Sequence, residues 1–298
     1  MNEAQRDALL GRHGVGRGDE LGQGGEAWVY ALDAQRVLRV HRQEAAAYAR
    51  RIGDLYGALD RSAVPYALPE VLEVHGDGEV SWSIERRLPG RPFDELLRRL
   101  DGDQRTRAFA AYVDGAVAFR ALGPPRGWAG GCRELFTDEL LHADRWGDLL
   151  ADRLALQLER ARPALDRAID DPDAAAAPIL AAARAEEADL LTLVHGDWFP
   201  GNVLLDDDLR VSAAIDLGWL TVVGAADHDA LSAAVFCEVL PTHRAADGAV
   251  LEAAVARHLG LHTAEALART RRYEQLRFAF VTEDRHLHQW CLSGLLTS

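Results

Sequence analysis

Residues 194–218 read VHGDWFPGNVLLDDDLRVSAAIDLG, a stretch that places three oxygen-bearing side chains at fixed offsets. Short apolar runs lie on both sides of an aspartate cluster at 206–208, so the pattern predicts a loop, a strand, a turn and a second strand. Asp197 then lies in the loop before this hairpin, Asn202 at its entrance and Asp216 at its exit. One end of the hairpin would therefore carry all three side chains.

Oxygen donors gathered in this way suit a polyphosphate bound to magnesium. Mg²⁺ prefers oxygen ligands, keeps several waters, and usually takes only one or two carboxylates together with phosphate oxygens. A carboxylate left off the metal can orient a hydroxyl group and accept its proton. Asn202 and Asp216 are therefore the candidate metal ligands, and Asp197 is the candidate catalytic base.

Three motifs in this order resemble the signature of the aminoglycoside phosphotransferase and choline-kinase-like family: His195-Gly196-Asp197, Asn202, and Ile215-Asp216-Leu217-Gly218. Either outer motif alone would be an ordinary turn, but both in order, with Asn at the expected offset, form a specific pattern. Leu217 replaces the usual aromatic residue, which concerns packing beside the metal and leaves the ligand intact. The resemblance implies an α+β, bilobal protein-kinase-like fold. It has a small antiparallel-sheet lobe at 1–88 that binds nucleotide and a larger, mainly helical lobe at 89–298 that holds the catalytic loop and the acceptor.

The front of the chain has the pattern of a small sheet with one helix. Residues 19–41 alternate between apolar runs and turn signals, which predicts three short antiparallel strands. We expect a helix at about 42–59, and then a second hairpin from the runs at 68–74 and 80–87. Pro and Gly stop regular structure at 88–92, and we expect the two lobes to meet there.

The resemblance implies that this front lobe holds the nucleotide. Its nucleotide-binding residues would come from a glycine-rich turn, the third strand, the helix and the linker: Gly22, Gly24, Gly25, Arg39, Glu44, Arg86 and Leu88. Glycines let backbone N–H groups approach phosphate oxygens, although they would equally serve an ordinary tight hairpin.

Arg39 stands where the family usually has lysine, and Glu44 would be its partner. Arginine is longer, planar and bidentate, so it is not a free substitute. Because the chain contains no lysine at all, we give this departure little weight. The alternatives are a solvent-facing charge at Arg39 and, at Glu44, an acid favoured by the helix dipole.

The rear of the chain is predicted to be helical. From residue 93 onward, apolar residues recur every three or four positions, as is typical of helices that face a core. Residues 170–177 contain four alanines and would form an exposed loop with a weak helix start. We expect residues 180–191 to be helical again.

Two further groups of rear-lobe residues follow from the resemblance. His195 and Asp229 would give structural support, and Asp229 would do so by capping a helix or by bracing the catalytic loop. The acceptor pocket of the family is built from C-terminal helices, where acids bind substrate amines. The candidates are Glu238, Glu283 and Asp284, and a solvated helix face is the alternative for each.

The composition is that of an ordinary globular protein of 298 residues, with 48% hydrophobic and 27% charged residues. A net charge of -14 argues against a nucleic-acid or anionic-membrane partner and is compatible with a cationic small acceptor. No stretch approaches the roughly 20 apolar residues of a spanning helix, and the first ten residues lack a leader pattern, so we expect a cytoplasmic protein. Cys132, Cys237 and Cys291 should be reduced and mostly buried, and the histidines lack zinc-site spacing.

Together these observations predict a small-molecule kinase that transfers the γ-phosphate of ATP or GTP, with Mg²⁺, to a hydroxyl group. The acceptor is an aminoglycoside-like or other amino-alcohol or sugar molecule whose identity stays open, as do the nucleotide preference and the choice between monomer and homodimer. Arg39 would also fit a nucleotide-binding scaffold without transferase activity. A helical binding module would have no nucleotide affinity. The intact Asp197, Asn202 and Asp216 favour the kinase.

Overall fold

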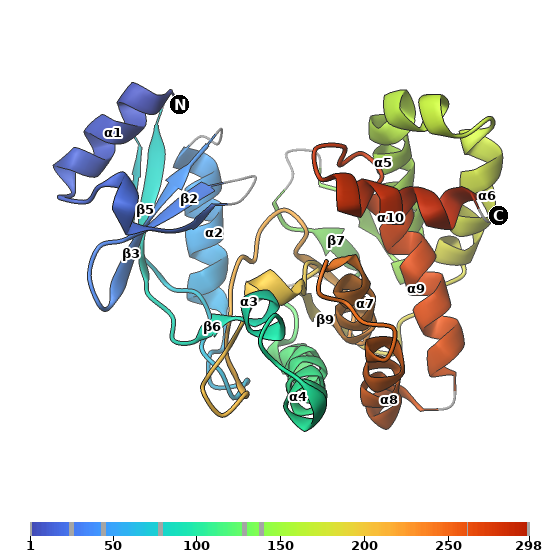
Figure 1. The fold of residues 1–298 in the computed structure, drawn as a ribbon. Helices are drawn as coiled ribbons and strands as arrows, with labels where there is room; N and C mark the ends of the chain where they lie inside the picture. The colour runs from blue at the N-terminus through green and yellow to red at the C-terminus, as the bar shows by residue number, and fades with distance from the viewer. Residues whose placement is uncertain are drawn as a thin grey trace.

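Figure 1 shows the chain as two lobes, with the N-terminal sheet and its helices on one side and most of the remaining helices on the other. This computed structural model describes residues 2–23, 27–42, 46–76, 80–126, 130–136, 140–260 and 262–296. The arrangement confirms the bilobal α+β fold that the sequence predicts. The division between residues 88 and 89 stays a prediction.

The front lobe is built on a five-stranded antiparallel sheet. Its strands are β1 (Glu20–Gln23), β2 (Ala27–Ala31), β3 (Arg36–His41), β4 (Val71–Gly76) and β5 (Ser81–Arg86), in the spatial order β1-β2-β3-β5-β4. Leu38 and Val40 of β3 point into a small core, so the two-residue repeat of the strand turns Arg39 to the opposite face. α2 (Ala46–Ala58) packs against β4 and β5. The predicted strands are confirmed, while residues 43–45 of the expected helix lie outside the described residues.

A helix that the sequence does not predict, α1 (Glu3–Arg12), precedes the sheet and is followed by the short 3-10 helix η1 (Arg17–Asp19). Asn2 begins it with a capping box. The Gln5 amide donates to the Asn2 side chain at 2.9 Å, and the Asn2 amide donates to the Gln5 side chain at 2.8 Å. Leu9 and Leu10 bury this helix against the sheet. Two leucines are too few to reveal a helical period.

The linker between the lobes pairs, as a short strand, with the hairpin of the rear lobe. β6 (Arg91–Pro92) pairs with β10 (Val203–Leu205), which pairs in turn with β11 (Val211–Ala214). Gly90 has φ of 110°, and a Cβ there would lie 2.1 Å from the Ser212 hydroxyl oxygen. Only glycine fits this crossing, which explains the stop signal in the sequence.

The rear lobe is mainly helical around a second small sheet. Its helices are α3 (Phe93–Leu97), α4 (Gly102–Phe119), η2 (Arg120–Leu122), α5 (Trp146–Ala168), α6 (Pro172–Arg184), η3 (Pro200–Asn202), α7 (His228–Phe236), η4 (Cys237–Val239), α8 (Asp247–Leu259), α9 (Thr263–Arg277) and α10 (Arg285–Leu296). The sheet has the order β8-β7-β12-β9, with β7 (Cys132–Glu134), β8 (His142–Ala143), β9 (Leu191–Val194) and β12 (Val222–Ala225).

Two local predictions for this lobe are wrong. Residues 172–184 form α6 instead of an exposed loop, because the Asp171 carboxylate caps the Ala174 amide at 3.0 Å and Ala175 and Ala176 are buried. The helix expected at 180–191 ends at Arg184, and the chain enters β9 at Leu191. Residues 191–194 form a strand instead of a helix because β9 pairs with β12, and both of these strands are buried in the small sheet.

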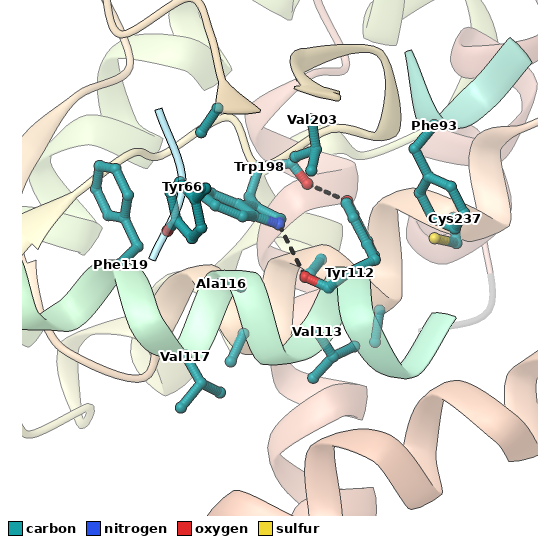
Figure 2. Close-up of a cluster of buried hydrophobic side chains, with 14 of the residues drawn as sticks. Tyr66, Phe93, Tyr112, Val113, Ala116, Val117, Phe119, Trp198, Val203 and Cys237 are labelled. Carbon is teal, nitrogen blue, oxygen red and sulfur yellow. Dashed lines mark hydrogen bonds between the residues drawn. The ribbon is translucent and has the colours of Figure 1, made fainter. Parts of the chain in front are cut away.

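The largest core gathers around Trp198, the residue that directly follows Asp197 (Figure 2). Its indole is fully buried between Tyr66, Phe119 and Tyr112. The Trp198 Nε1 donates to the Tyr112 carbonyl at 3.3 Å, and the Tyr112 hydroxyl donates back to the Trp198 carbonyl. A buried side chain of this size contributes about 3 kcal/mol, so the core anchors the loop that carries Asp197.

Two sequence expectations about the chain as a whole can be compared with the fold. Within the described ranges, no helix combines the length and the apolar character needed to cross a bilayer. The thiols of Cys132, Cys237 and Cys291 are buried and unbridged, as predicted.

Candidate active site

The loop that carries Asp197 depends on a glycine directly before it. β9 ends at Val194, and Gly196 then takes φ of 74°, where a Cβ would lie 2.0 Å from the Leu220 carbonyl oxygen. No other residue type fits this turn. The amides of His195 and Gly196 donate to the Asp229 carboxylate at 2.7 and 2.9 Å. Asp229 lies in the first turn of α7 and thus binds the loop rather than capping its own helix.

His195 ties the loop to the end of the hairpin. The imidazole is buried, its Nδ1 accepts from the Asp197 amide at 3.3 Å, and its Nε2 lies 2.8 Å from the Ile215 carbonyl oxygen. The two bonds are consistent with the tautomer that carries the proton on Nε2. His195 therefore contacts backbone on both sides, and its role as structural support stays a prediction.

The three oxygen donors meet at one end of the β10–β11 hairpin. The Asn202 Nδ2 donates to Asp197 Oδ2 at 2.9 Å and to the Asp197 carbonyl at 3.1 Å, while the Ile215 amide donates to the Asn202 carbonyl at 2.8 Å. Asp216 follows with φ of 65°, a left-handed conformation that is uncommon outside glycine. Because the Asn202 nitrogen is engaged with Asp197, its Oδ1 is the atom open to a cation.

The two carboxylates have opposite electrostatic surroundings. Burial raises the pKa of Asp197 to about 6, the charge of Asp216 adds to this rise, and Arg277 and Asn202 oppose it. Burial would also raise the pKa of Asp216, but the charge and the hydrogen bond of Arg39 together oppose this effect, and the pKa is lowered. The pKa of Asp197 is thus close to neutral pH, while Asp216 stays ionised. Such a difference in pKa is expected of a base and a metal ligand.

Arg39 crosses from the front lobe to reach the site. Its guanidinium on β3 donates to Asp216 Oδ1. Glu85 on β5 is buried nearby: burial raises its pKa, and the charge of Arg39 opposes the rise. The Ser83 hydroxyl donates to Glu85 at 2.7 Å. Glu85 is thus an acid beside Arg39 that the sequence does not single out, because strand pairing alone brings β3 and β5 together.

The remaining nucleotide-binding candidates stay predictions. Gly24, Gly25 and Glu44 lie outside the described residues, and Gly22 is exposed on β1. The exposed Arg86 forms an ion pair with Glu70, and its amide donates to the Glu70 carbonyl at 2.9 Å. Leu88 is half-buried on the linker.

The three acceptor candidates have different surroundings and are not joined to Asp197 by a direct contact. Arg271 binds both carboxylate oxygens of Glu238, with Nε to Oε2 at 2.7 Å, and the Trp290 indole nitrogen lies 3.4 Å from the same Oε2. The Asp284 carboxylate caps α10 through the amides of His286 and Leu287. Glu283 is exposed. Their role in acceptor binding stays a prediction.

A residue that the sequence reading missed lies behind the loop. Arg277, the last residue of α9, donates to the Gly196 carbonyl at 2.8 Å and to Glu274 at 2.9 Å. Both side chains are buried. Arg277 is one of 33 basic residues, all of them arginine, so no local signal in the chain singles it out.

The donor set is suited to magnesium rather than to zinc. Across the described ranges, no group of three or more His, Cys, Asp and Glu side chains is arranged to hold a metal. One ionised carboxylate and one amide oxygen, with phosphate oxygens completing the shell, is a usual magnesium arrangement. Asn202 and Asp216 fit this requirement.

The antiparallel front sheet, the cation that it presents to the hairpin and the helical rear lobe define a kinase-like phosphotransferase. The model of the phosphotransferase enzyme family matches residues 19–247, and the chain belongs to this family.

Solved structures of phosphotransferases share the fold over nearly their whole length. The chain is similar to APH(2")-IIa in its gentamicin complex, with 16% identity and a TM-score of 0.66 over 100% of this chain and 97% of that chain. It is also similar to the macrolide 2'-phosphotransferase MphH from Brachybacterium faecium, with 16% identity and a TM-score of 0.57 over 98% and 97%. At these identities the likeness establishes the fold. No curated protein matches the chain significantly.

Proposed function

We propose that the chain transfers the γ-phosphate of ATP or GTP to a hydroxyl group of a small-molecule acceptor. Asp197 orients the acceptor hydroxyl and accepts its proton, while Asn202 and Asp216 hold Mg²⁺. The observation that supports this most is that two carboxylates at one end of the hairpin have pKa values shifted in opposite directions. The pKa of Asp197, the proposed base, is raised to about 6, and the pKa of Asp216, the proposed metal ligand, is lowered. That division matches what phosphoryl transfer needs.

The residues of this chain contribute mainly position and charge. The Asn202 amide holds the Asp197 carboxylate through Oδ2, which leaves Oδ1 to face the acceptor hydroxyl. Arg39 is a fixed cation at the lobe junction and would bind the phosphate oxygens of the nucleotide. The metal, when bound, supplies further positive charge to the transferring phosphate.

The acceptor class is drawn from the related structures and from the charge of the chain. Related structures contain gentamicin, streptomycin and kanamycin, and another relative is a macrolide phosphotransferase. A net charge of -14 suits a cationic acceptor. We propose an aminoglycoside-like or other amino-alcohol or sugar acceptor, whose amine would compete with Arg271 for Glu238.

A substrate screen tests the proposal. Protein, Mg²⁺ and either ATP or GTP are incubated with gentamicin, kanamycin, streptomycin, a macrolide, choline and amino sugars, and each acceptor is examined for the mass gain of one phosphate. We expect at least one acceptor to gain a phosphate with the wild-type protein and none with Asp197→Ala. Equal phosphorylation by the two proteins would remove Asp197 from the role of base.

The pairing of Arg39 with Asp216 also fits a second function, a nucleotide-binding scaffold without transferase activity. In that protein the guanidinium would occupy the carboxylate that the metal needs. Tight nucleotide binding, with no release of ADP or GDP above the rate in water across the whole acceptor panel, would favour the scaffold.

A further inference from the structure

A buried ion pair within α9 lies behind the loop that carries Asp197. Arg277 of α9 is 2% exposed and Glu274, one turn earlier, is 0% exposed. The Arg277 Nη1 lies 2.9 Å from Glu274 Oε2, and the Ser232 hydroxyl of α7 donates to Glu274 Oε1 at 2.9 Å. The carboxylate is therefore held from both helices, and it fixes the orientation of the guanidinium.

The free end of that guanidinium is directed at the loop. Its Nη2 donates to the Gly196 carbonyl at 2.8 Å. This carbonyl and the Asp197 amide belong to one peptide group, and the Asp197 amide donates to His195 Nδ1 at 3.3 Å. A peptide group is planar, so contacts at its oxygen and at its nitrogen fix the plane that immediately precedes the Asp197 α-carbon.

The Arg277–Glu274 pair is not explained by a contribution to stability alone. Removing two charges from water is costly, and well-packed apolar residues often stabilise a helix interface as well or better. The pair has a geometric consequence that apolar residues could not reproduce: a charged donor at a defined point beside the loop.

We propose that Arg277, oriented by Glu274, is a positioning residue that sets the plane of the Gly196–Asp197 peptide and thereby the direction of the Asp197 carboxylate. The inference rests on the proposed kinase function. Arg277 touches neither acceptor nor nucleotide in this proposal. Its loss therefore lowers kcat while the KM for nucleotide, which is bound by the front lobe, stays nearly unchanged.

The test compares Arg277→Ala and Arg277→Lys with Arg269→Ala. Arg269 lies on the same helix but is half-exposed and pairs with Glu186 at 2.7 Å, so it controls for the loss of an arginine from α9. We expect kcat to fall about 10- to 100-fold in Arg277→Ala, as a displacement of about 1 Å at the reacting groups would cause. Lysine, a single-point donor, should restore part of the rate. Millimolar guanidinium should do the same for the alanine variant and do nothing for Arg269→Ala.

A second measurement is independent of activity. Hydrogen exchange of the amides in residues 193–199 should be faster in both Arg277 variants than in the wild type and the Arg269 control. Unchanged kcat and unchanged exchange in either folded Arg277 variant would overturn the proposal. If the wild type itself phosphorylates no acceptor, the kinase function fails, whereas faster exchange would still show that Arg277 holds the loop.

Discussion

At the scale of single residues, Asp197 and Asp216 carry the same functional group and behave differently because of their neighbours. The Asp197 carboxylate accepts a hydrogen bond from the Asn202 amide, and burial is the largest influence on its pKa. Asp216 lies against the guanidinium of Arg39. Burial would raise its pKa, but the charge and the hydrogen bond of Arg39 act together against burial, and the pKa is lowered. The roles proposed for them follow from these contacts and from no property of aspartate itself.

The first prediction concerns the pH dependence of the reaction. Only the ionised form of Asp197 can accept a proton, so kcat/KM should rise with pH through about 6 and then level off. Asp197→Asn should lower kcat by about 100-fold or more and leave nucleotide affinity in place. A pH–rate profile and calorimetric titration with nucleotide would check both. An asparagine variant with the same acid limb as the wild type would contradict this assignment.

The second prediction concerns Gly196. Alanine there would be strained at φ of 74° and would press its Cβ against the Leu220 carbonyl, so Gly196→Ala should lower the free energy of unfolding by about 2 to 4 kcal/mol. Gly248→Ala is the matched control, because that helical glycine of α8 has open space at its Cβ and should gain up to about 1 kcal/mol. Urea unfolding measures both variants. Similar values for the two would show that the loop relaxes around alanine.

At the scale of elements, α7, α9 and α5 meet at His228. The imidazole is buried edge-on to Trp146 and Tyr273, and its Nε2 lies 3.6 Å from Glu274 Oε1. Burial, together with the nearby charges of Arg277 and Arg153, lowers its pKa to about 3. The helix junction behind the active site is therefore built to hold a neutral histidine.

The third prediction follows from that lowered pKa. Below pH 6.5 the unfolded chain takes up a proton that the folded chain refuses down to about pH 3, so this contribution to stability is lost as the pH falls. Between pH 7.5 and 5 the loss should be about 2 kcal/mol. It should be absent from His228→Gln. Urea unfolding of both proteins at the two pH values gives the difference, in which other titrating groups cancel. Parallel pH dependence would mean that the histidine is protonated in the folded chain.

Several elements could be predicted from local patterns, and others could not. The β10–β11 hairpin follows from apolar runs around an aspartate turn, and the front strands from their alternation. α1 has too few apolar residues to reveal a period. β12 is four residues long and becomes a strand because β7 and β9 pair with it on both sides. Short buried strands of this kind depend on neighbours distant in the chain.

At the scale of the whole molecule, the front lobe holds residues 216–219 at three points. Arg39 binds Asp216, the Tyr56 hydroxyl of α2 donates to the Leu217 carbonyl at 2.9 Å, and Tyr48 stacks on Trp219 with ring centroids 5.1 Å apart. The position of Asp216, the proposed metal ligand, is thus coupled to the lobe that would bind nucleotide. Leu217, which replaces the usual aromatic residue, is fully buried in the central core.

The fourth prediction tests this junction. Arg39→Met removes a charged donor from the nucleotide side, so the affinity for Mg²⁺–ATP or Mg²⁺–GTP should fall about 10-fold or more. The rise in melting temperature caused by nucleotide should shrink accordingly. Arg36→Met is the control, because Arg36 lies on the same strand but is exposed and pairs with Asp33. Equal nucleotide affinity in the two variants would exclude Arg39 from phosphate binding.

The amino-acid sequence by itself determined the order of the motifs, the hairpin that gathers Asp197, Asn202 and Asp216, and the alternation of the front sheet. Each of these depends on residues that are near one another in the sequence, where the spacing of residue types predicts the local geometry. Only the tertiary structure decided that Glu85 lies beside Arg39, that Asp229 holds the loop amides and that Arg277 holds the loop carbonyl. Those contacts join residues that are far apart in the chain. Burial of apolar side chains during tertiary packing brings them together, and such long-range contacts produce no periodic pattern in the sequence.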